Sequence, residues 1–316
     1  MKTLINSHIF WKFGLKGNNP ILNEPTDLLY GRIQNILKWI PVLFLGFQFV
    51  QLFNVHNLSK TKLISPLWPI FPFQEISSSN IVLFLQINIF ISLIWLIFKP
   101  KSLLIKLYVF STYFLYVAFS NSFGKIDHSM HLALMLLFCY VLMPSSKIAG
   151  YKAKTILMFA TAQFFLLLSY SLTGVWKLFW GIIQLIKGEV SIFSPLSFRN
   201  TLIVQFQVKP PTVLGSWLIE HYYIGWLAFW VVLYIELFSV YVFFRSNLHK
   251  PWGVLLIMLH FGIALVMDIV MFAPPVIIGA LLVMSPFYKG TSFEKTLQSF
   301  PIISNILHVF RFKAST

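Results

Sequence analysis

The chain is organised as a series of long apolar stretches separated by short segments that carry most of its charges. Eight stretches occur, near residues 37–53, 81–98, 103–120, 130–143, 155–177, 223–244, 252–272 and 274–288. A helix needs about 20 apolar residues to span a bilayer. Only 10% of the residues are charged, against about 25% in soluble domains. We therefore predict an all-α, polytopic helical protein of the cell membrane with about eight transmembrane helices. The fourth and eighth stretches are short, which predicts steep or broken helices.

Basic residues alternate between the two sides of these stretches. Seventeen Lys and Arg residues lie on one side, in the N-terminal segment through Lys38 and in residues 99–106, 147–154, 245–250 and 289–316. The alternate connections hold 6, and Lys177 completes the 24. Basic loops of membrane proteins stay in the cytoplasm. Both termini are therefore expected in the cytoplasm. The net charge of +15 then reflects membrane orientation, so the expected partner is the lipid bilayer and no nucleic acid is expected.

The same pattern divides the chain into three parts. Residues 1–36 form an N-terminal cytoplasmic or interfacial segment, 37–288 a transmembrane domain and 289–316 a basic cytoplasmic tail. Residues 178–222 are the one long connection and form an extracytoplasmic loop in this topology. A connection of this length is typical of a lid or a binding element. A surface loop that rests on the lipid headgroups is the equal alternative.

Lys177 stands out because it is a charge at the end of the fifth apolar stretch. The residues at helical spacing before it are Gly174, Thr173, Tyr170 and Gln163. One face of this helix therefore carries hydroxyls, an amide and an ammonium, and it should look into protein or water and not into lipid. Two interpretations are open. Lys177 reaches the headgroups as a snorkelling side chain, or it is a desolvated general base in a dry pocket.

Other polar side chains lie within or beside the apolar stretches. The topology places His128 on the same outer side as Lys177, and His260 near the middle of the membrane with Asp268 two turns further along its face. Glu236 lies inside the sixth stretch, where a charge costs about 2.5 kcal/mol or more, so it should be paired, protonated or facing a cavity. For both histidines, capping and packing roles stand beside functional ones.

The sequence lacks the familiar signatures of soluble enzymes. It contains no P-loop, no dinucleotide-binding glycine pattern, no HExxH and no nucleophile elbow. His128 and His131 share a helical turn, but two ligands without a third do not make a metal site, so no metal is predicted. The single cysteine, Cys139, excludes an internal disulfide and is expected in the core.

Three short motifs resemble one family of membrane enzymes. Residues 127–129 (Asp-His-Ser) resemble the Asn-His-Ser segment of vitamin K-dependent gamma-glutamyl carboxylases, and residues 173–178 (Thr-Gly-Val-Trp-Lys-Leu) resemble their Ala-Gly-Val-Lys-Lys-Leu segment. The stretch that begins at His260 and closes on residues 285–287 (Ser-Pro-Phe) is similar to their later histidine helix. Order and spacing agree across residues 30–290. The chain thus resembles the HTTM (horizontally transferred transmembrane) family, which these carboxylases share with many bacterial proteins.

The resemblance implies a reaction at the outer face of a bacterial plasma membrane. In the carboxylases, a lysine matching Lys177 deprotonates a reduced quinone of the vitamin K type. Oxygenation then gives a strong base that removes a proton from a glutamate gamma-carbon, and the carbanion takes up carbon dioxide. A histidine matching His128 assists carboxylation. We therefore predict Lys177, His128 and His260 as catalytic residues, and Tyr170, Thr173, Trp180, Asp268 and Glu236 as cofactor-binding residues.

Two departures from the carboxylases keep other functions open. Trp176 stands where the animal enzymes have the first of two lysines, and their large soluble domain has no counterpart after the last apolar stretch. Some bacterial members of the family resemble the sporulation-delaying type of protein, which assists maturation of a secreted peptide toxin, and a compact chain like this one suits that role too. The first hypothesis is an enzyme that acts on a lipid-soluble or peptide substrate. The second is a non-catalytic membrane factor for maturation, export or immunity of a secreted peptide, working with a partner membrane protein, and a transporter is the third.

Overall fold

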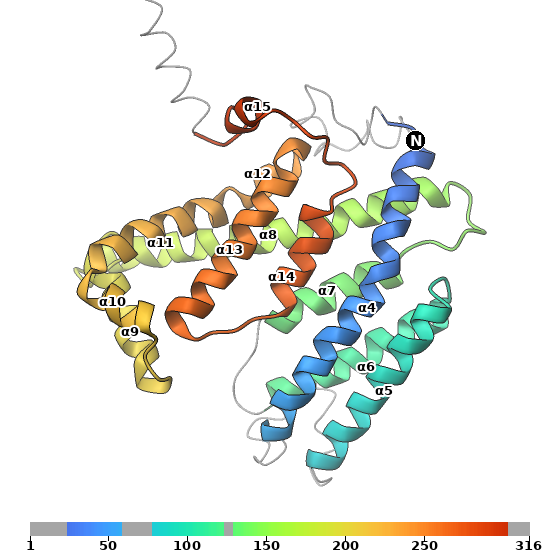
Figure 1. Ribbon diagram of the computed structural model, residues 1–316, viewed down its shortest axis with the longest axis horizontal. Coiled ribbons are helices and arrows are strands. Elements are labelled where there is room, and N and C mark those ends of the chain that lie inside the picture. Colours follow the sequence, from blue (N-terminus) through green and yellow to red (C-terminus); the bar gives the residue numbers. More distant parts are fainter. Residues whose placement is uncertain (1–23, 59–77, 123–128, 303–316) are drawn as a thin grey trace, which may run out of the picture. The chain divides into compact units, whose positions relative to one another are not determined.

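Every regular element that the structure, a computed structural model, describes is a helix (Figure 1). The described residues are 24–58, 78–122 and 129–302, and no strand occurs within them. The predicted all-α class is therefore confirmed. Long helices that are apolar on most of their surface are typical of membrane spans and of deeply buried core helices.

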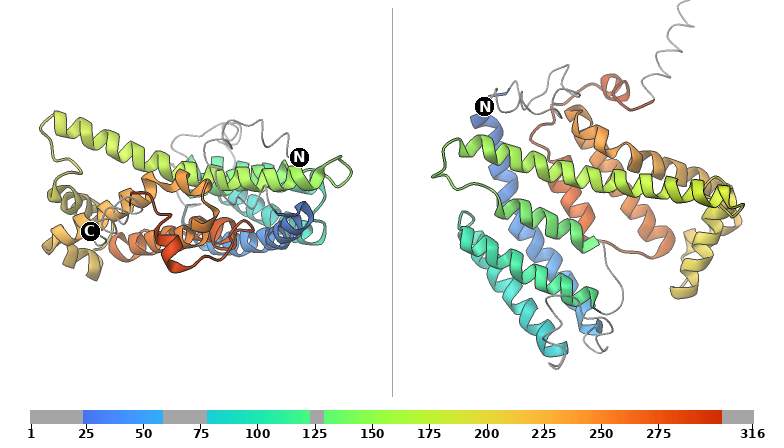
Figure 2. Two further views of the ribbon diagram at one scale, coloured as in Figure 1. Left: turned by 90° about the horizontal axis from the view of Figure 1, so that it is seen from above. Right: turned by 180° about the vertical axis from the view of Figure 1, so that it is seen from behind.

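The chain divides into two compact units. The N-terminal unit comprises Pro25–Ala162 and Phe272–Ala280. The C-terminal unit comprises Gln163–Met271 and the residues from Leu281 onward, together with Glu24. The longest helix, α8 (Tyr151–Ile186), contributes its first turns to the N-terminal unit and the remainder to the C-terminal unit (Figure 2).

The N-terminal unit is built from helices that follow one another along the chain. Besides the start of α8 they are α4 (Thr26–Leu58), α5 (Ser78–Phe98), α6 (Leu103–Asn121), α7 (Ser129–Val141) and the short α14 (Ala273–Ile278). Helix α4 packs on α5, α5 on α6, α6 on α7, and α7 on α14. Ser102 caps the start of α6, because its hydroxyl accepts a hydrogen bond from the backbone N–H of Ile105.

Polar contacts close one end of the N-terminal unit. Lys152 at the start of α8 donates to the Asp27 carboxylate at the start of α4 at 2.6 Å. The hydroxyl of Tyr140 near the end of α7 donates to the carbonyl of Pro100 in the turn between α5 and α6 at 3.4 Å. The starts of α4, α6 and α8 therefore meet the ends of α5 and α7 at this place.

The C-terminal unit contains the remainder of α8 and a set of shorter helices. They are α9 (Pro195–Val208), α10 (Val213–Glu220), α11 (Tyr222–Leu237), α12 (Ser239–Phe243), a 3₁₀ turn η2 (Ser246–Leu248), α13 (His249–Met267) and α15 (Phe293–Leu297). Helix α9 packs on α11, and α10 packs on α9, α11 and α13. A π-helical turn η3 (Gly279–Val283) directly follows α14, and its last residues lie in this unit.

Residues 178–222, expected as a loop, are largely helical. Helix α8 continues past Lys177 to Ile186 because the residues there are still mostly apolar helix formers. It ends at Gly188, which is left-handed (φ +72°), with the N–H of Glu189 bonded to the carbonyl of Gln184 at 2.9 Å. This is a Schellman ending. Helices α9 and α10 fill most of the rest, so the segment is a packed part of the C-terminal unit.

Three described helices are long and apolar enough to cross a membrane. They are Leu103–Asn121, Tyr151–Ile186 and Ser246–Met267. The pair Val213–Glu220 and Tyr222–Leu237 would make a fourth span if its 108° bend is a break within one span. Helix α7, with 13 residues, and the helix Ala273–Val283 are short, as expected for the fourth and eighth stretches. The count of eight spans stays a prediction.

The structure describes part of the expected segments at the two ends of the chain. Helix α4 begins at Thr26, so the last residues of the expected segment 1–36 are helical. The described part of the tail packs on the C-terminal unit, because Tyr234 donates to the carbonyl of Pro301 at 2.7 Å and Phe300 lies against the Trp252 ring. Residues 1–23 and 303–316 lie outside the described residues.

Candidate active site

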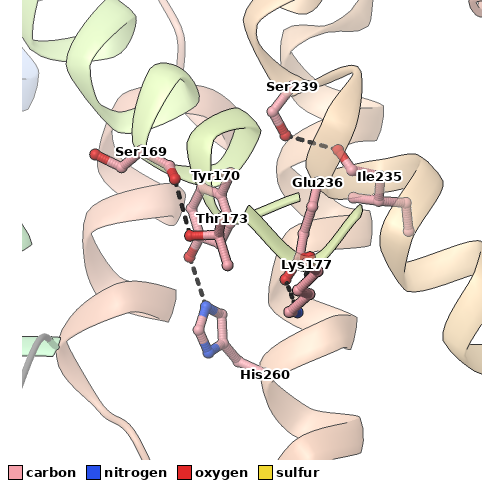
Figure 3. Close-up of polar contacts among 8 residues, drawn as sticks. All are labelled: Ser169, Tyr170, Thr173, Lys177, Ile235, Glu236, Ser239 and His260. Atoms are coloured by element: carbon pink, nitrogen blue, oxygen red, sulfur yellow. Dashed lines mark hydrogen bonds and ion pairs between the residues drawn. The ribbon is translucent and has the colours of Figure 1, made fainter. Parts of the chain in front are cut away.

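Helix α8 carries a line of polar residues on the face that packs within the C-terminal unit. The line consists of Gln163, Tyr170, Ser171, Gly174 and the half-buried Lys177. This agrees with the inward-looking face predicted from the sequence. Thr173 is the exception: it is exposed, and its hydroxyl donates to the carbonyl of Ser169 one turn earlier on the same helix (Figure 3).

Lys177 and Glu236 form an ion pair between α8 and α11. The ammonium Nζ lies 2.6 Å from Oε1 and 2.7 Å from Oε2 of the carboxylate. Glu236 is only 5% exposed, whereas Lys177 is 32% exposed. The ring of Phe229 lies 5.8 Å from the same Nζ. The acidic residue predicted to need a partner therefore has one, and the pair is accessible from the lysine side.

Gly174 permits the close approach of α8 and α11 that this ion pair needs. A Cβ atom at this position would lie 2.8 Å from the backbone nitrogen of Leu237 and 3.0 Å from Cβ of Glu236. Any larger residue would have to push the α11 backbone away. Gly174 precedes Lys177 by one turn, so the close contact and the ion pair belong to one crossing of the two helices.

Ser171 satisfies the backbone where α11 ends and α12 begins. Its hydroxyl donates to the carbonyl of Leu237 at 3.0 Å and accepts from the N–H of Val240 at 2.8 Å. A helix break leaves such groups without intrahelical partners. The Ser171 side chain thus replaces the missing bonds and fixes the break just after Glu236.

Tyr170 and His260 form a second polar pair, between α8 and α13. The phenol oxygen and His260 Nε2 are hydrogen-bonded at 2.5 Å, and the two rings meet edge to face (Figure 3). Both side chains are 8% exposed. The other ring nitrogen of His260, Nδ1, is buried and has no hydrogen-bond partner among the described residues. Among the described residues of the C-terminal unit, Oε1 of Gln163 and Nε2 of His249 are likewise buried without a partner.

A third polar group lies further back along α8. The amide of Gln163 donates to the carbonyl of Leu281 in the π-helical turn at 2.5 Å and to the hydroxyl of Ser285 at 3.0 Å. Ser285 is also hydrogen-bonded to Nδ1 of His249 at 2.8 Å. Our sequence reasoning missed His249, although it precedes His260 by 11 residues, about three helical turns, and so shares its face.

Asp268 is not part of this arrangement. The prediction that it shares the helical face of His260 is wrong. The helix α13 ends at Met267, and Asp268 follows in a left-handed conformation (φ 54°). Helical periodicity therefore does not reach it. Its carboxylate lies 3.5 Å from Nζ of Lys209, which also donates to its carbonyl at 2.7 Å, so Asp268 joins the connection after α9.

Trp180 does not contribute to the polar groups of the site. Trp180 is 43% exposed and meets Trp176 edge to face, with ring centroids 5.6 Å apart. These rings lie on the outer surface of α8. His128 lies outside the described residues, and its predicted role stays a prediction.

The described part of the chain holds no group of three or more His, Cys, Asp or Glu side chains that could bind a metal ion. Cys139 is buried and free. His131 lies in the N-terminal unit, 3.4 Å from the side-chain amide of Asn121. The site is thus an arrangement of proton donors and acceptors, namely amine, carboxylate, phenol and imidazole.

Comparison with known proteins does not assign the chain to a family. No family model, curated protein or solved structure matches the chain. The site itself has to carry the functional argument. Tyr170 and Lys177 are seven residues apart on one face of α8, about 10 Å along the helix axis, so a hydrogen-bonded pair and an ion pair lie along the same helix.

Proposed function

We propose that the chain is a multi-pass protein of a bacterial plasma membrane. The three long apolar helices support this proposal, as does the alternation of basic connections along the sequence. In the proposed topology eight segments cross the membrane, both termini are cytoplasmic, and Lys177 lies towards the outer side. The bend between α10 and α11 then belongs to a broken or re-entrant segment.

Within that membrane protein, we propose an HTTM-type, carboxylase-like enzyme in which Lys177 is the general base. The observation that carries the proposal is the Lys177–Glu236 pair, with 32% of the lysine exposed and its partner almost fully buried. An ion pair taken out of water is destabilised relative to its neutral form. Transfer of one proton from the ammonium to Glu236 gives a neutral amine, which is the form that a general base requires.

We propose a reduced quinone as the cofactor because the amine and the imidazole of the site have suitable chemistry for it. A hydroquinone has hydroxyl groups that can donate to an amine or to an imidazole nitrogen, and the unpaired Nδ1 of His260 is such an acceptor in one tautomer. Tyr170 holds the other nitrogen of this ring and so fixes its orientation. When bound, the reduced quinone supplies the oxidisable ring whose reaction with oxygen yields a strong base in vitamin K-dependent carboxylases. Lys177 would accept the hydroxyl proton, and Glu236 would hold the proton it took from Lys177.

The test uses purified protein in proteoliposomes with a vitamin K-type hydroquinone, oxygen, bicarbonate and a glutamate-containing peptide, and it measures quinone epoxide. Lys177→Ala should lower the rate by about 100-fold or more, the usual contribution of a general base. Lys177→Arg should be equally inactive, because a guanidinium keeps the charge but does not give up its proton. The control is Lys187→Ala, which removes an exposed lysine ten residues further on and should leave the rate within about two-fold of wild type.

A second candidate function is favoured by the closed geometry of the same pair. Both carboxylate oxygens lie within 2.7 Å of the ammonium, as in a purely structural link between α8 and α11. The protein would then be a non-catalytic factor for maturation, export or immunity of a secreted peptide. In that case Lys177→Arg restores the function of the chain in cells, and no epoxide forms with any variant. Either result would overturn the enzymatic proposal.

A further inference from the structure

The N-terminal unit contains a cavity at the end where five helices meet. Its volume is about 130 Å³, and its walls come from α4, the turn between α5 and α6, α6, α7, the connection after α7 and α8. The polar residues in its wall include Lys38, Lys101, Lys106, Tyr30, Ser145 and Ser146. No Asp or Glu is among the lining residues. The cavity is therefore basic and rich in hydrogen-bond donors.

Lys106 is the feature of this cavity that calls for a ligand. Its side chain is only 7% exposed, yet it forms no ion pair with a carboxylate in the described part of the chain. Its ammonium lies 4.6 Å from the centre of the Tyr140 ring, and the hydroxyl of Tyr140 is already bonded to the carbonyl of Pro100. A buried cation without an anion is costly, and the ring face offers only partial compensation.

The described residues of the N-terminal unit provide no free carboxylate to compensate the charge of Lys106. The described residues of the N-terminal unit contain eight Lys and Arg residues, namely Arg32, Lys38, Lys99, Lys101, Lys106, Lys147, Lys152 and Lys154, and a single acidic residue, Asp27. Asp27 is already paired with Lys152. Burial, with a contribution from the Tyr151 phenol, raises the pKa of Tyr30, so this phenol stays a neutral donor. Among the described residues of this unit, no anion therefore compensates the charge of Lys106.

We propose that this cavity binds a phosphate group, carried by an anionic phospholipid or by a soluble phosphate. The size is suitable, because an apolar cavity of about 150 Å³ admits benzene, and a phosphate group has fewer heavy atoms than benzene. Lysine is a common ligand of phosphate. In the proposed topology these helix ends face the cytoplasm, where basic pockets between membrane helices bind lipid headgroups. The binding chemistry does not depend on the enzymatic role of Lys177.

The experiment measures thermal unfolding of the full chain in nanodiscs. One arm compares phosphatidylcholine discs with discs that contain phosphatidylglycerol, and a second arm adds inorganic phosphate to phosphatidylcholine discs. The variant is Lys106→Met, and the matched control is Lys154→Met, which removes an exposed lysine of the same unit that does not line the cavity. The half-saturating ligand concentration should rise about ten-fold or more for Lys106→Met, the usual effect of losing a charged hydrogen bond. For Lys154→Met it should stay within about two-fold of wild type.

The variants also differ without ligand, which separates binding from misfolding. In phosphatidylcholine discs without phosphate, Lys106→Met should unfold at the same or a higher temperature than wild type, because the unpaired buried charge is gone. Stabilisation by phosphatidylglycerol alone identifies a lipid headgroup, and stabilisation by inorganic phosphate identifies a soluble phosphate. The proposal is overturned if neither ligand stabilises the wild type. It is equally overturned if Lys106→Met and Lys154→Met weaken binding alike.

Discussion

Replacing Lys177 by methionine should destabilise the fold far more than replacing Glu236 by methionine. The two partners differ in their access to water, with Glu236 at 5% and Lys177 at 32% exposure. Loss of the lysine leaves a carboxylate buried under Gly174 and the helix break. Loss of the glutamate leaves an ammonium on a flexible stem that can turn towards water or the headgroups. The asymmetry follows from burial alone and does not depend on function.

Protonation of the Glu236 carboxyl group sets an upper limit on the stability lost in Lys177→Met. Glu236 in Lys177→Met can avoid its buried charge by taking up a proton, and for a reference pKa of about 4.3 this costs about 3.7 kcal/mol at pH 7. We therefore expect a loss of about 3 kcal/mol, in line with other broken buried pairs. At pH 5 the same proton uptake costs only about 1 kcal/mol, so the variant should recover most of its stability. Glu236→Met should cost about 1 kcal/mol, because the remaining lysine is partly solvated.

The assay is thermal unfolding of the purified variants in one detergent or nanodisc composition at pH 7 and pH 5. A loss of 1 kcal/mol lowers the midpoint by about 2–4 °C, so Lys177→Met should unfold about 6–12 °C below wild type at pH 7. The double variant Lys177→Met/Glu236→Met replaces the pair by apolar side chains and should return close to wild type. Additive losses in the double variant would refute the coupling, and equal losses in the two single variants would refute the argument from burial.

Two more predictions concern the helix contacts around this pair. Gly174→Ala should cost about 1–3 kcal/mol in thermal unfolding, because its Cβ would overlap the Leu237 backbone. The control Gly262→Ala, where nothing lies within 4 Å of the new Cβ, should be neutral or stabilising by up to about 1 kcal/mol. Tyr170→Phe should cost about 1–3 kcal/mol because it leaves His260 without its partner. His260→Leu, added to Tyr170→Phe, should cost less than it does alone, as a double-mutant cycle would show.

The sequence alone located most of the site because polar residues inside apolar stretches are conspicuous. Tyr170, Lys177, Glu236 and His260 were all singled out on that ground. Helical periodicity does not predict which of these residues pair with one another, because the partners on α11 and α13 depend on how the helices cross α8. Extrapolating a helical face also fails where a helix ends, which is why Asp268 was misplaced.

The fold was predictable to a similar extent. The apolar stretches fall on α4 to α8 and on α11 to α14, because burial or lipid contact selects for hydrophobicity along a helix. The helices α9 and α10 were missed, although Ser194 followed by Pro195 is a helix-start signal and Ser194 does cap α9. Mixed polar and apolar residues in that segment concealed it, because half-exposed helices lack a continuous apolar run.

A structural and a catalytic role for Lys177 make different demands on the same ion pair. A structural link is strongest when both groups stay charged, whereas a base must lose its proton at low cost. Burial of only one partner is compatible with both roles. The buried carboxylate of Glu236 favours proton uptake, while the half-exposed amine of Lys177 stays accessible to a substrate. Ser171 and Gly174 both act on Glu236, the buried partner. Ser171 fixes the helix break that follows Glu236, and Gly174 permits the close approach of the Glu236 backbone to α8. The contacts to α8 thus fix the position of Glu236, whereas Lys177 keeps about a third of its side chain exposed. If Lys177 is a base, this exposed side is where it would exchange a proton with a bound molecule.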